Sequence, residues 1–353
     1  MVDNIKKVNT NAAPTQSGFH FQDFSALYLF LSNIKQTKWI NVEGQDDIDI
    51  MYVDGSMHFY QAKEVHDTEK QIPAAEFRKS ISVLSDDTNS AVNSEQIKDL
   101  AIVTNTNRPF GATSEKPFRS EYMKVLFPNL TVDNRKKLRN YLKTAIKKVA
   151  QGKKAELQRF DVKRLSVIKI QYFGDDEKSR LQLLYKTVLE ILEQSPIPSD
   201  WAGQLMETWR LLLTGVTPFP STKITKQHFI SHTEATLLDH PEFDGFFEEF
   251  NVSIENEDYI KSQYHSYLEI ISSDFSIISD VETSFVEFKA DNRGLRHNQL
   301  KNKFVNDFSH VIAGKLGLNM EPRNLEIAKL ITWSIIKKIN MFHDVREVFG
   351  VDN

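Results

Sequence analysis

VEGQDDIDIMYVDGSMHFYQAKEV, residues Val42 to Val65, is the stretch that decides how the N-terminal part of this chain is expected to fold. Two runs of strand-forming residues flank Asp54-Gly55, a dipeptide typical of tight β-hairpin turns. We expect a hairpin whose loop comprises residues 54–56. This loop would pair Val53 with Met57 and fix the register of both strands.

That register determines which polar side chains meet. It places Asp49 opposite Gln61 and Asp47 opposite Lys63, and opposed residues of antiparallel strands share one face of the sheet. The other face then carries only apolar side chains, those of Ile48, Ile50, Tyr60 and Ala62. A two-residue turn would instead place Asp46 opposite Lys63. We prefer the first register because it leaves one face wholly apolar.

Carboxylates, an amide and an ammonium in one cluster suit metal-dependent phosphodiester cleavage. Mg²⁺ or Mn²⁺ would take one or two carboxylates, completed by other oxygens. The Lys63 ammonium could orient a water or stabilise charge at phosphorus, while the metal polarises the phosphate and its bound water. We therefore predict four metal ligands, Glu43, Asp47, Asp49 and Gln61, which together with Lys63 form the catalytic set. The alternative is an exposed cross-strand salt bridge that adds little stability.

The same residues carry a family resemblance. An upstream acid, an aspartate on a hairpin and (D/E/Q)-x-K on the next strand resemble the PD-(D/E)xK nuclease superfamily, in the Gln variant of Mrr-type restriction endonucleases. With GFHFQ at Gly18–Gln22, the pattern is similar to the double-stranded-DNA endonuclease domain of bacterial antiphage effectors. Such effectors occur in cyclic-oligonucleotide signalling systems and in SMC-associated Lamassu systems. The motifs cover Gly18 to Lys63, and the order of elements extends the likeness less specifically to Phe229.

The resemblance implies roles for individual residues. Lys63 would be the catalytic lysine, Gln61 the second motif position and Glu43 the upstream acid. Asp47 fits an E-x-x-(D/E)-D-(I/V) pattern and Asp49 an Mrr-like G-I-D pattern, so the principal aspartate stays open. We favour Asp47, with Asp49 as a second ligand. Gln22 is a candidate support of the active site or a buried structural amide.

The remaining pattern predicts an α/β fold, a restriction-endonuclease-like mixed sheet flanked by helices. A helix over Phe19–Lys35 precedes the hairpin, and Lys98–Thr104 and Leu165–Phe173 have the character of buried strands. The turn-rich Gly215–Thr225 marks a boundary. We expect a flexible arm over residues 1–17, a nuclease domain over 18–229, and a mainly helical regulatory or partner-binding region over 230–353.

Charge is segregated along the chain, although the net charge is only −4. Asp239 to Asp291 holds 14 acidic residues against two lysines, whereas Arg135 to Lys154 holds nine basic residues and no acid. A basic helix over Arg135–Ala150 could follow DNA phosphates or simply be a solvated face. The predicted nucleic-acid-binding residues are Arg135, Lys136, Lys137, Arg139, Lys143, Lys147 and Lys148.

Composition limits the other function classes. The chain has no cysteine, which excludes disulfides and thiolate zinc sites and fits a reducing compartment. It has no apolar run long enough to span a membrane, and its N-terminus lacks the apolar core of a signal peptide. We therefore expect a cytoplasmic protein with no membrane association.

The expected function is a DNA endonuclease effector of antiphage defence with little sequence specificity. Its partners would be double-stranded DNA and, by family analogy and length, an SMC-type ATPase complex that restrains it. Cutting both strands needs two active sites, which favours a homo-oligomer in the active state. The alternatives are a non-catalytic interaction or scaffold subunit with a degenerate nuclease fold, and an RNase on the same fold.

Overall fold

The chain forms two compact units. The computed structural model describes residues 13–44, 46–90, 96–112, 116–148, 154, 157, 160–216 and 222–351. The first unit consists of Met1–Thr187 and Leu213–Lys223, and the second of Val188–Leu212 and Ile224–Asn353. The chain thus passes between the units three times, whereas the sequence suggested one boundary near Phe229. Of the expected N-terminal arm, residues 1–12 lie outside the described residues, and residues 13–17 are already helical.

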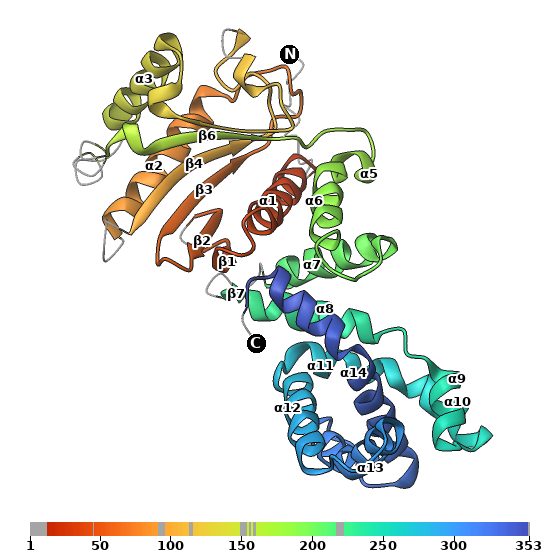
Figure 1. Cartoon of the computed structure of the whole chain (residues 1–353). Coiled ribbons are helices and arrows are strands. Elements are labelled where there is room, and N and C mark those ends of the chain that lie inside the picture. Colours follow the sequence, from red (N-terminus) through yellow and green to blue (C-terminus); the bar gives the residue numbers. More distant parts are fainter. Residues whose placement is uncertain are drawn as a thin grey trace, which may run out of the picture. The chain divides into compact units, whose positions relative to one another are not determined.

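The first unit is built on a mixed β-sheet (Figure 1). Its strands are β1 (Thr37–Val42), β2 (Ile48–Tyr52), β3 (Met57–Lys63), β4 (Ile97–Thr104), β5 (Tyr122–Leu126) and β6 (Leu165–Ile170). They lie in the order β5-β6-β4-β3-β2-β1. β3, β4 and β6 run parallel to one another, and the other neighbouring strands pair antiparallel. With the helices below, this arrangement confirms the predicted restriction-endonuclease-like α/β fold.

Helices cover both faces of this sheet (Figure 1). α1 (Ala13–Leu31) contacts β1, β2 and β3, while α2 (Ala74–Ser90) contacts β3 and β4 and packs against α3 (Val132–Lys148). Successive strand residues point to opposite faces. Phe59 therefore joins Phe77 of α2 in one buried cluster, whereas Ile48 is fully buried on the opposite face, the side of α1.

Two elements of this unit, α2 and β5, were not predicted from the sequence. α2 carries Phe77, Ile81 and Leu84, all fully buried, at helical spacing. The polar residues around them, such as DDTNS at the end of the helix, made this helical periodicity hard to recognise in the sequence. β5 is a short edge strand in which only Val125 is buried, so it has no alternating pattern to detect. Both elements matter because β5 completes the sheet beside β6 and α2 covers the face of Phe59.

The hairpin register differs from the predicted one by two residues. Asp49 pairs with Phe59, not Gln61, and Met51 pairs with Met57. Gly55 has a left-handed φ of 81°, and the Tyr52 N–H donates to the Ser56 carbonyl at 2.9 Å. Such a glycine ends a three-residue loop, so the loop comprises residues 53–55 and Ser56 is already paired. The predicted loop has the correct length but begins one residue too late.

The chain has further short elements between the strands and after β6. They are η2 (Lys116–Phe118), η3 (Phe127–Asn129), η4 (Val162–Arg164), α5 (Glu177–Arg180), α6 (Gln182–Leu192), η5 (Ser199–Trp201) and α7 (Ala202–Val216). Apart from the two-residue β7 (Ile224–Thr225), the second unit is helical. Its later helices are α8 (Lys226–Leu238), α9 (Phe243–Phe250), α10 (Ile254–Gln263), η6 (Tyr264–Tyr267), α11 (Leu268–Ser273), α12 (Ser276–Asp291), α13 (His297–Lys315) and α14 (Pro322–Val348).

α14 forms the core of the second unit. It contacts α8, α9, α10, α12 and α13, and residues on several of its sides, including Ile327, Leu330, Ile331 and Trp333, are at most 1% exposed. Among the described residues, no helix is both long and apolar enough to cross a bilayer. The mainly helical character predicted for the C-terminal region is confirmed.

Candidate active site

The turn between β1 and β2 is held in an uncommon conformation. Glu43 has a left-handed φ of 60°, which costs a non-glycine residue on the order of 1 kcal/mol. Its N–H donates to the Asp47 carbonyl at 3.1 Å, and its Oε1 accepts from Gln22 Nε2 at 2.8 Å. Gln22 Nε2 also donates to the Asp47 carbonyl at 2.9 Å. One buried amide of α1 therefore fixes both ends of the turn.

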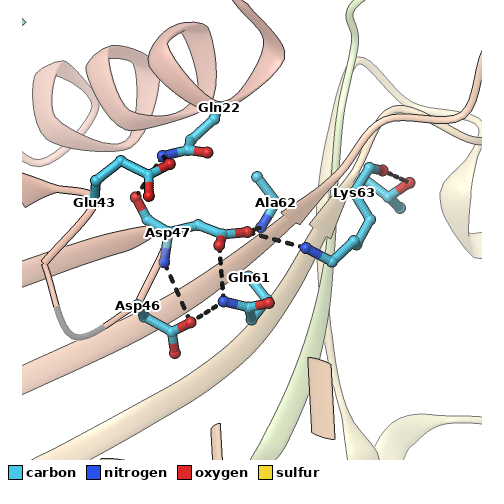
Figure 2. Close-up of polar contacts among 8 residues, drawn as sticks. Gln22, Glu43, Asp46, Asp47, Gln61, Ala62 and Lys63 are labelled. Atoms are coloured by element: carbon cyan, nitrogen blue, oxygen red, sulfur yellow. Dashed lines mark hydrogen bonds and ion pairs between the residues drawn. The ribbon is translucent and has the colours of Figure 1, made fainter. Parts of the chain in front are cut away.

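The Asp47 carboxylate meets three consecutive residues at the end of β3 (Figure 2). Oδ2 accepts from the Ala62 N–H at 2.8 Å and from Lys63 Nζ at 3.1 Å, and Oδ1 accepts from Gln61 Nε2 at 2.9 Å. Asp47 immediately precedes β2, so its side chain reaches the end of β3 without being part of the ladder. The structure thus brings together Asp47, Gln61 and Lys63, although by a different register from the predicted one.

Asp46 and Asp49 occupy buried positions beside this centre. Asp46 Oδ1 accepts from Gln61 Nε2, and the Asp46 N–H donates to Asp49 Oδ1 at 3.1 Å. Both residues are at most 5% exposed. A Cβ at Gly44 would collide with the Asp49 carboxylate and the Asn41 amide, so a larger residue there would force these side chains or the turn to shift. Asp49 therefore stabilises the turn by accepting the Asp46 N–H. Asp46 was not part of the predicted catalytic set.

Thr104, the last residue of β4, and Asn105, which follows it, hold the end of β3 from the neighbouring strand. Thr104 Oγ1 donates to the Lys63 carbonyl at 2.8 Å. Asn105 Oδ1 accepts from the Val65 N–H at 2.7 Å, and its Nδ2 donates to the Val65 carbonyl at 3.0 Å and the Tyr172 carbonyl at 3.1 Å. The sequence analysis passed over both residues. An asparagine directly after a buried strand was the available signal, because buried amides need partners.

The ion pair at the centre stays accessible to solvent. The side chains of Lys63 and Asp47 are 16% and 23% exposed. Beyond β3, Glu64 Oε1 accepts from Ser17 Oγ of α1 at 2.8 Å. The site therefore has a rigid, buried base and a partly open top, where a phosphate could approach the ammonium and the carboxylate together.

The cluster contains carboxylate and amide oxygens, which are the type of atom that Mg²⁺ binds. Among the described residues, no three His, Asp or Glu side chains lie close enough together to hold a metal. Mg²⁺ requires fewer, since it commonly takes one or two carboxylates and completes its shell with water and phosphate oxygens. Asp46 Oδ1 and Asp47 Oδ1 converge on the same Gln61 amide group, and an amide can present its oxygen as well as its nitrogen. Residues 43–61 thus offer a compact set of hard oxygen donors.

Comparison with known proteins points to a nuclease family. Residues 13–172 match the family model of the Cap4 dsDNA endonuclease domain. The matched segment begins with α1, ends just after β6, and contains every residue of the cluster described above. This part of the chain is therefore similar to that endonuclease domain, and the match covers less than half of the chain. The second unit lies wholly outside the match. No curated protein matches the chain.

Solved structures of Cap4 also show similarity. Two are the Acinetobacter baumannii Cap4 SAVED/CARF-domain containing receptor with 3'3'3'-cAAA and with 2'3'3'-cAAA, at 18% and 17% identity and TM-scores of 0.36 and 0.35. Each match covers 64% of this chain, and it covers 50% and 47% of the respective receptor chains. The chain therefore spans about half the length of the Cap4 receptors that it matches.

The predicted nucleic-acid-binding residues lie on α3, within the Cap4-matched segment. Lys136, Arg139, Lys143 and Lys147 are exposed and recur every three or four residues, so they share one face of the helix. Lys148 is exposed beside them. The other two residues make local contacts: Arg135 Nη1 donates to the Pro128 carbonyl at 2.8 Å, and Lys137 Nζ donates to the Phe110 carbonyl.

Proposed function

We propose that this chain is a metal-dependent DNA endonuclease effector of bacterial antiphage defence. The observation that carries the proposal is the Asp47 carboxylate, bonded to Gln61, Ala62 and Lys63 within a segment that matches the Cap4 dsDNA endonuclease domain. A salt bridge kept only for stability would not require a strained turn and a dedicated buried amide behind it. Strain held in place by surrounding structure is typical of functional sites.

Each residue of the cluster would have its own role in the reaction. Asp47 and Glu43 would hold Mg²⁺ or Mn²⁺ with the Gln61 amide oxygen, and Asp49 remains a candidate second ligand. The ion would polarise the scissile phosphate and lower the pKa of a bound water. Lys63 would stabilise the charge that develops at phosphorus, or orient the attacking water. Gln22 keeps Glu43 and the Asp47 main chain in place, so that both carboxylates enter the reaction already oriented.

DNA would be held through its backbone. The exposed stripe of Lys136, Arg139, Lys143 and Lys147 on α3 can neutralise phosphates without reading bases, which gives binding with little sequence specificity. Cleavage of both strands by one type of active site requires two copies, and we propose that the active form is a homo-oligomer. Such an enzyme in the bacterial cytoplasm must be restrained, and an SMC-type ATPase complex or another defence protein would provide that control.

Plasmid cleavage tests the proposal. Purified protein is incubated with supercoiled plasmid and Mg²⁺ or Mn²⁺, with EDTA as a control, and compared with Lys63→Ala. Lys70→Ala is the matched control, because Lys70 is 76% exposed and pairs with Asp67 at 3.5 Å in the following loop. We expect metal-dependent cutting that falls on the order of 10²–10³-fold in Lys63→Ala, as when one charge-stabilising group is removed.

Four outcomes would contradict this function. Cutting that persists in EDTA would exclude the metal, and cutting unchanged in Lys63→Ala would exclude the site. If expression in cells is equally toxic for wild type, Lys63→Ala and Asp47→Ala, the chain acts as a scaffold with a degenerate nuclease fold. Cleavage of RNA but not of plasmid under the same conditions would identify an RNase on this fold.

A further inference from the structure

The second unit contains a pocket that the nuclease function does not use. It has a volume of about 470 Å³ and lies where α12 is followed by α13. Its lining comes from the end of α12, from the connecting segment 292–296 and from the start of α13. Pockets of roughly 300–1,000 Å³ are typical of sites for small molecules. The pocket lies outside the Cap4-matched segment, so family likeness assigns it nothing.

The ionisable side chains that line this pocket are all basic. Lys289 of α12, Arg293 of the connecting segment and His297 of α13 line it, and no acidic side chain does. The acids nearest in sequence, Glu287 and Asp291, are exposed and lie outside the lining. Within the described part of the chain, neither Lys289 nor Arg293 forms an ion pair. The pocket therefore presents two cations whose charge no protein group neutralises.

Charge along the chain reverses at this pocket. Residues 239–288 hold 13 acids against one lysine, whereas residues 289–303 hold five Lys or Arg against one acid. Two of these five, Lys301 and Lys303, pair with acids at 3.5 Å and 2.7 Å. The basic residues away from the pocket are thus neutralised, and those that line it are not.

Local hydrogen bonds occupy the carbonyls at the end of α12. Arg293 Nε donates to the Ala290 carbonyl at 3.2 Å, and Asn292 Nδ2 donates to the Phe288 carbonyl at 2.9 Å. Carbonyls at a helix C-terminus carry partial negative charge, and these bonds satisfy two of them. Because the guanidinium uses only Nε for this contact, its two terminal amino groups can donate to a ligand.

Exposed apolar side chains lie beside the cations. Val286 and Leu295, both of which line the pocket, are 65% and 38% exposed. Leu300, which is 4% exposed, adds an apolar base from α13. Apolar surface with a few converging polar groups is typical of a site for an organic ligand. The lining thus suits a molecule with an anionic head and a carbon body.

We propose that this pocket binds a small organic phosphate monoester. Such a group carries a charge of about −1.5 to −2 at neutral pH, so it neutralises Lys289 and Arg293 together, whereas a carboxylate neutralises only one of them. Arginine donates two parallel N–H groups to phosphate oxygens, and lysine acts on them as a point charge. The carbon body of the ester lies against Val286 and Leu295. A DNA backbone is better matched by an extended basic stripe, such as that on α3, than by a concave pocket with an apolar wall.

Binding of phenyl phosphate tests the proposal, because it joins a phosphate monoester to a compact apolar ring. Isothermal titration calorimetry uses the nucleic-acid-free full chain in EDTA, with inorganic phosphate and phenol as further probes. We expect phenyl phosphate to bind saturably, inorganic phosphate to bind more weakly and phenol not to bind. The double variant Lys289→Met, Arg293→Met should weaken phenyl phosphate by about tenfold or more, the effect of losing charged hydrogen bonds.

Three control variants locate the binding. The double variant Lys303→Met, Arg323→Met removes the same two charges from positions that are 52% and 54% exposed and lie outside the pocket, so it should bind phenyl phosphate as wild type does. Lys63→Met removes the cation of the candidate active site and should also leave this binding unchanged. Val286→Ser removes exposed apolar surface, so it should weaken phenyl phosphate and leave inorganic phosphate unchanged.

Several results would overturn the proposal. They are no saturable binding of phenyl phosphate, equal binding by wild type and the Lys289→Met, Arg293→Met variant, and binding of inorganic phosphate as tight as that of phenyl phosphate. Loss of binding in Lys63→Met would assign the ligand to the candidate active site instead. Plasmid cleavage does not enter this test, so it stands or falls independently of the nuclease function.

Discussion

Each unit contains a cluster of two or more carboxylates and one cation, and the two clusters differ in burial. In the first unit Asp47 and Lys63 pair at 3.1 Å with 23% and 16% of their side-chain areas exposed. In the second, Arg346 contacts Glu234 and Glu282 with at most 9% exposure of any partner. The first cluster is anchored by main-chain and amide groups around it. The second is anchored mainly by its own charges.

This difference in burial predicts which cluster contributes to catalysis and which contributes to the stability of the fold. Charges that remain partly in water contribute little to folding, and they can exchange partners when a metal or a phosphate arrives. Fully buried charges stabilise one another, so the loss of any one leaves another without a partner in a medium of low dielectric constant. We therefore expect substitutions in the first cluster to affect catalysis, and substitutions in the second to affect the free energy of unfolding. The following predictions test that division.

The largest expected effect is on stability, in Arg346→Met. Removal of this guanidinium leaves Glu234 and Glu282 facing each other without a cation, which should lower the free energy of unfolding by about 3–5 kcal/mol. Urea denaturation followed by tryptophan fluorescence measures it, because Trp209 and Trp333 of the second unit are both 1% exposed. Lys63→Met is the matched change in the first unit and should cost at most about 1 kcal/mol. Equal losses of unfolding free energy in both variants would contradict the proposed difference between the two clusters.

The next effect is on cleavage, in Asp47→Asn. The amide keeps the shape of the side chain but loses the charge that would hold both the metal and Lys63, so the rate of plasmid cleavage should fall on the order of 10²–10³-fold. Asp49→Asn makes the same change in the same turn. Because Asp49 Oδ1 accepts an N–H, and an amide oxygen can also accept, this variant should retain most of the activity. A loss as large as that of Asp47→Asn would assign Asp49 to the metal.

Stability of the second unit should also depend on pH through Glu234. Burial raises the pKa of this carboxyl from an ordinary 4.5 to about 8, although Arg346 opposes the rise. The folded state therefore retains a proton that the unfolded chain loses, and the two groups facing it are Arg346 of α14 and Glu282 of α12. The associated stability is fully present below about pH 4.5 and is lost as the pH rises through about 8.

Urea midpoints measured between pH 5 and pH 9 by tryptophan fluorescence check this dependence. Wild type should lose up to a few kcal/mol toward the alkaline end, and Glu234→Gln should flatten the profile. A profile that is the same in both proteins would show that Glu234 is ionised in the folded state throughout this range.

A smaller effect is expected from Gly44→Ala. Its Cβ would meet the Asp49 carboxylate and the Asn41 amide, so the turn that carries Asp47 must shift, at a cost of about 1–2 kcal/mol in unfolding free energy. The relative loss of cleavage rate should exceed the relative loss of unfolding free energy, because a small displacement of a catalytic group slows the reaction strongly. Gly18→Ala is the control, because a Cβ there meets nothing within 4 Å. Equal cleavage by the two variants would show that the turn can relax.

The smallest effect is in the salt dependence of DNA binding. Lys143 lies in the middle of the exposed stripe on α3, and Lys143→Ala should reduce the slope of log K against log salt by about 0.9 if it neutralises one phosphate. Lys137→Ala should change the slope less, because its ammonium donates to the Phe110 carbonyl. Fluorescence anisotropy of a labelled duplex at several salt concentrations measures both slopes.

The sequence by itself determined the strands of the hairpin, the mixed α/β fold and the residue types of the candidate site. Those inferences rest on short-range signals, such as the Asp54-Gly55 turn and the spacing of Gln61 and Lys63, which hold whatever surrounds them. The register was not determined in this way. A three-residue loop fits the sequence from either Val53 or Asp54, and the left-handed glycine that selects the first appears only in the folded hairpin.

Only the tertiary structure decided which partners distant residues acquire. Gln22 reaches Glu43 and Asp47 because α1 packs across β1 to β3. Asn105 directly follows β4, and it ties the end of β3 to the chain after β6 because β4 lies between those two strands. The Glu234–Arg346–Glu282 cluster joins residues of three helices that lie 48 (234 to 282) and 64 (282 to 346) positions apart in the sequence, with no local pattern that predicts their contact. Long-range contacts of this kind depend on packing and desolvation, which local propensities do not encode.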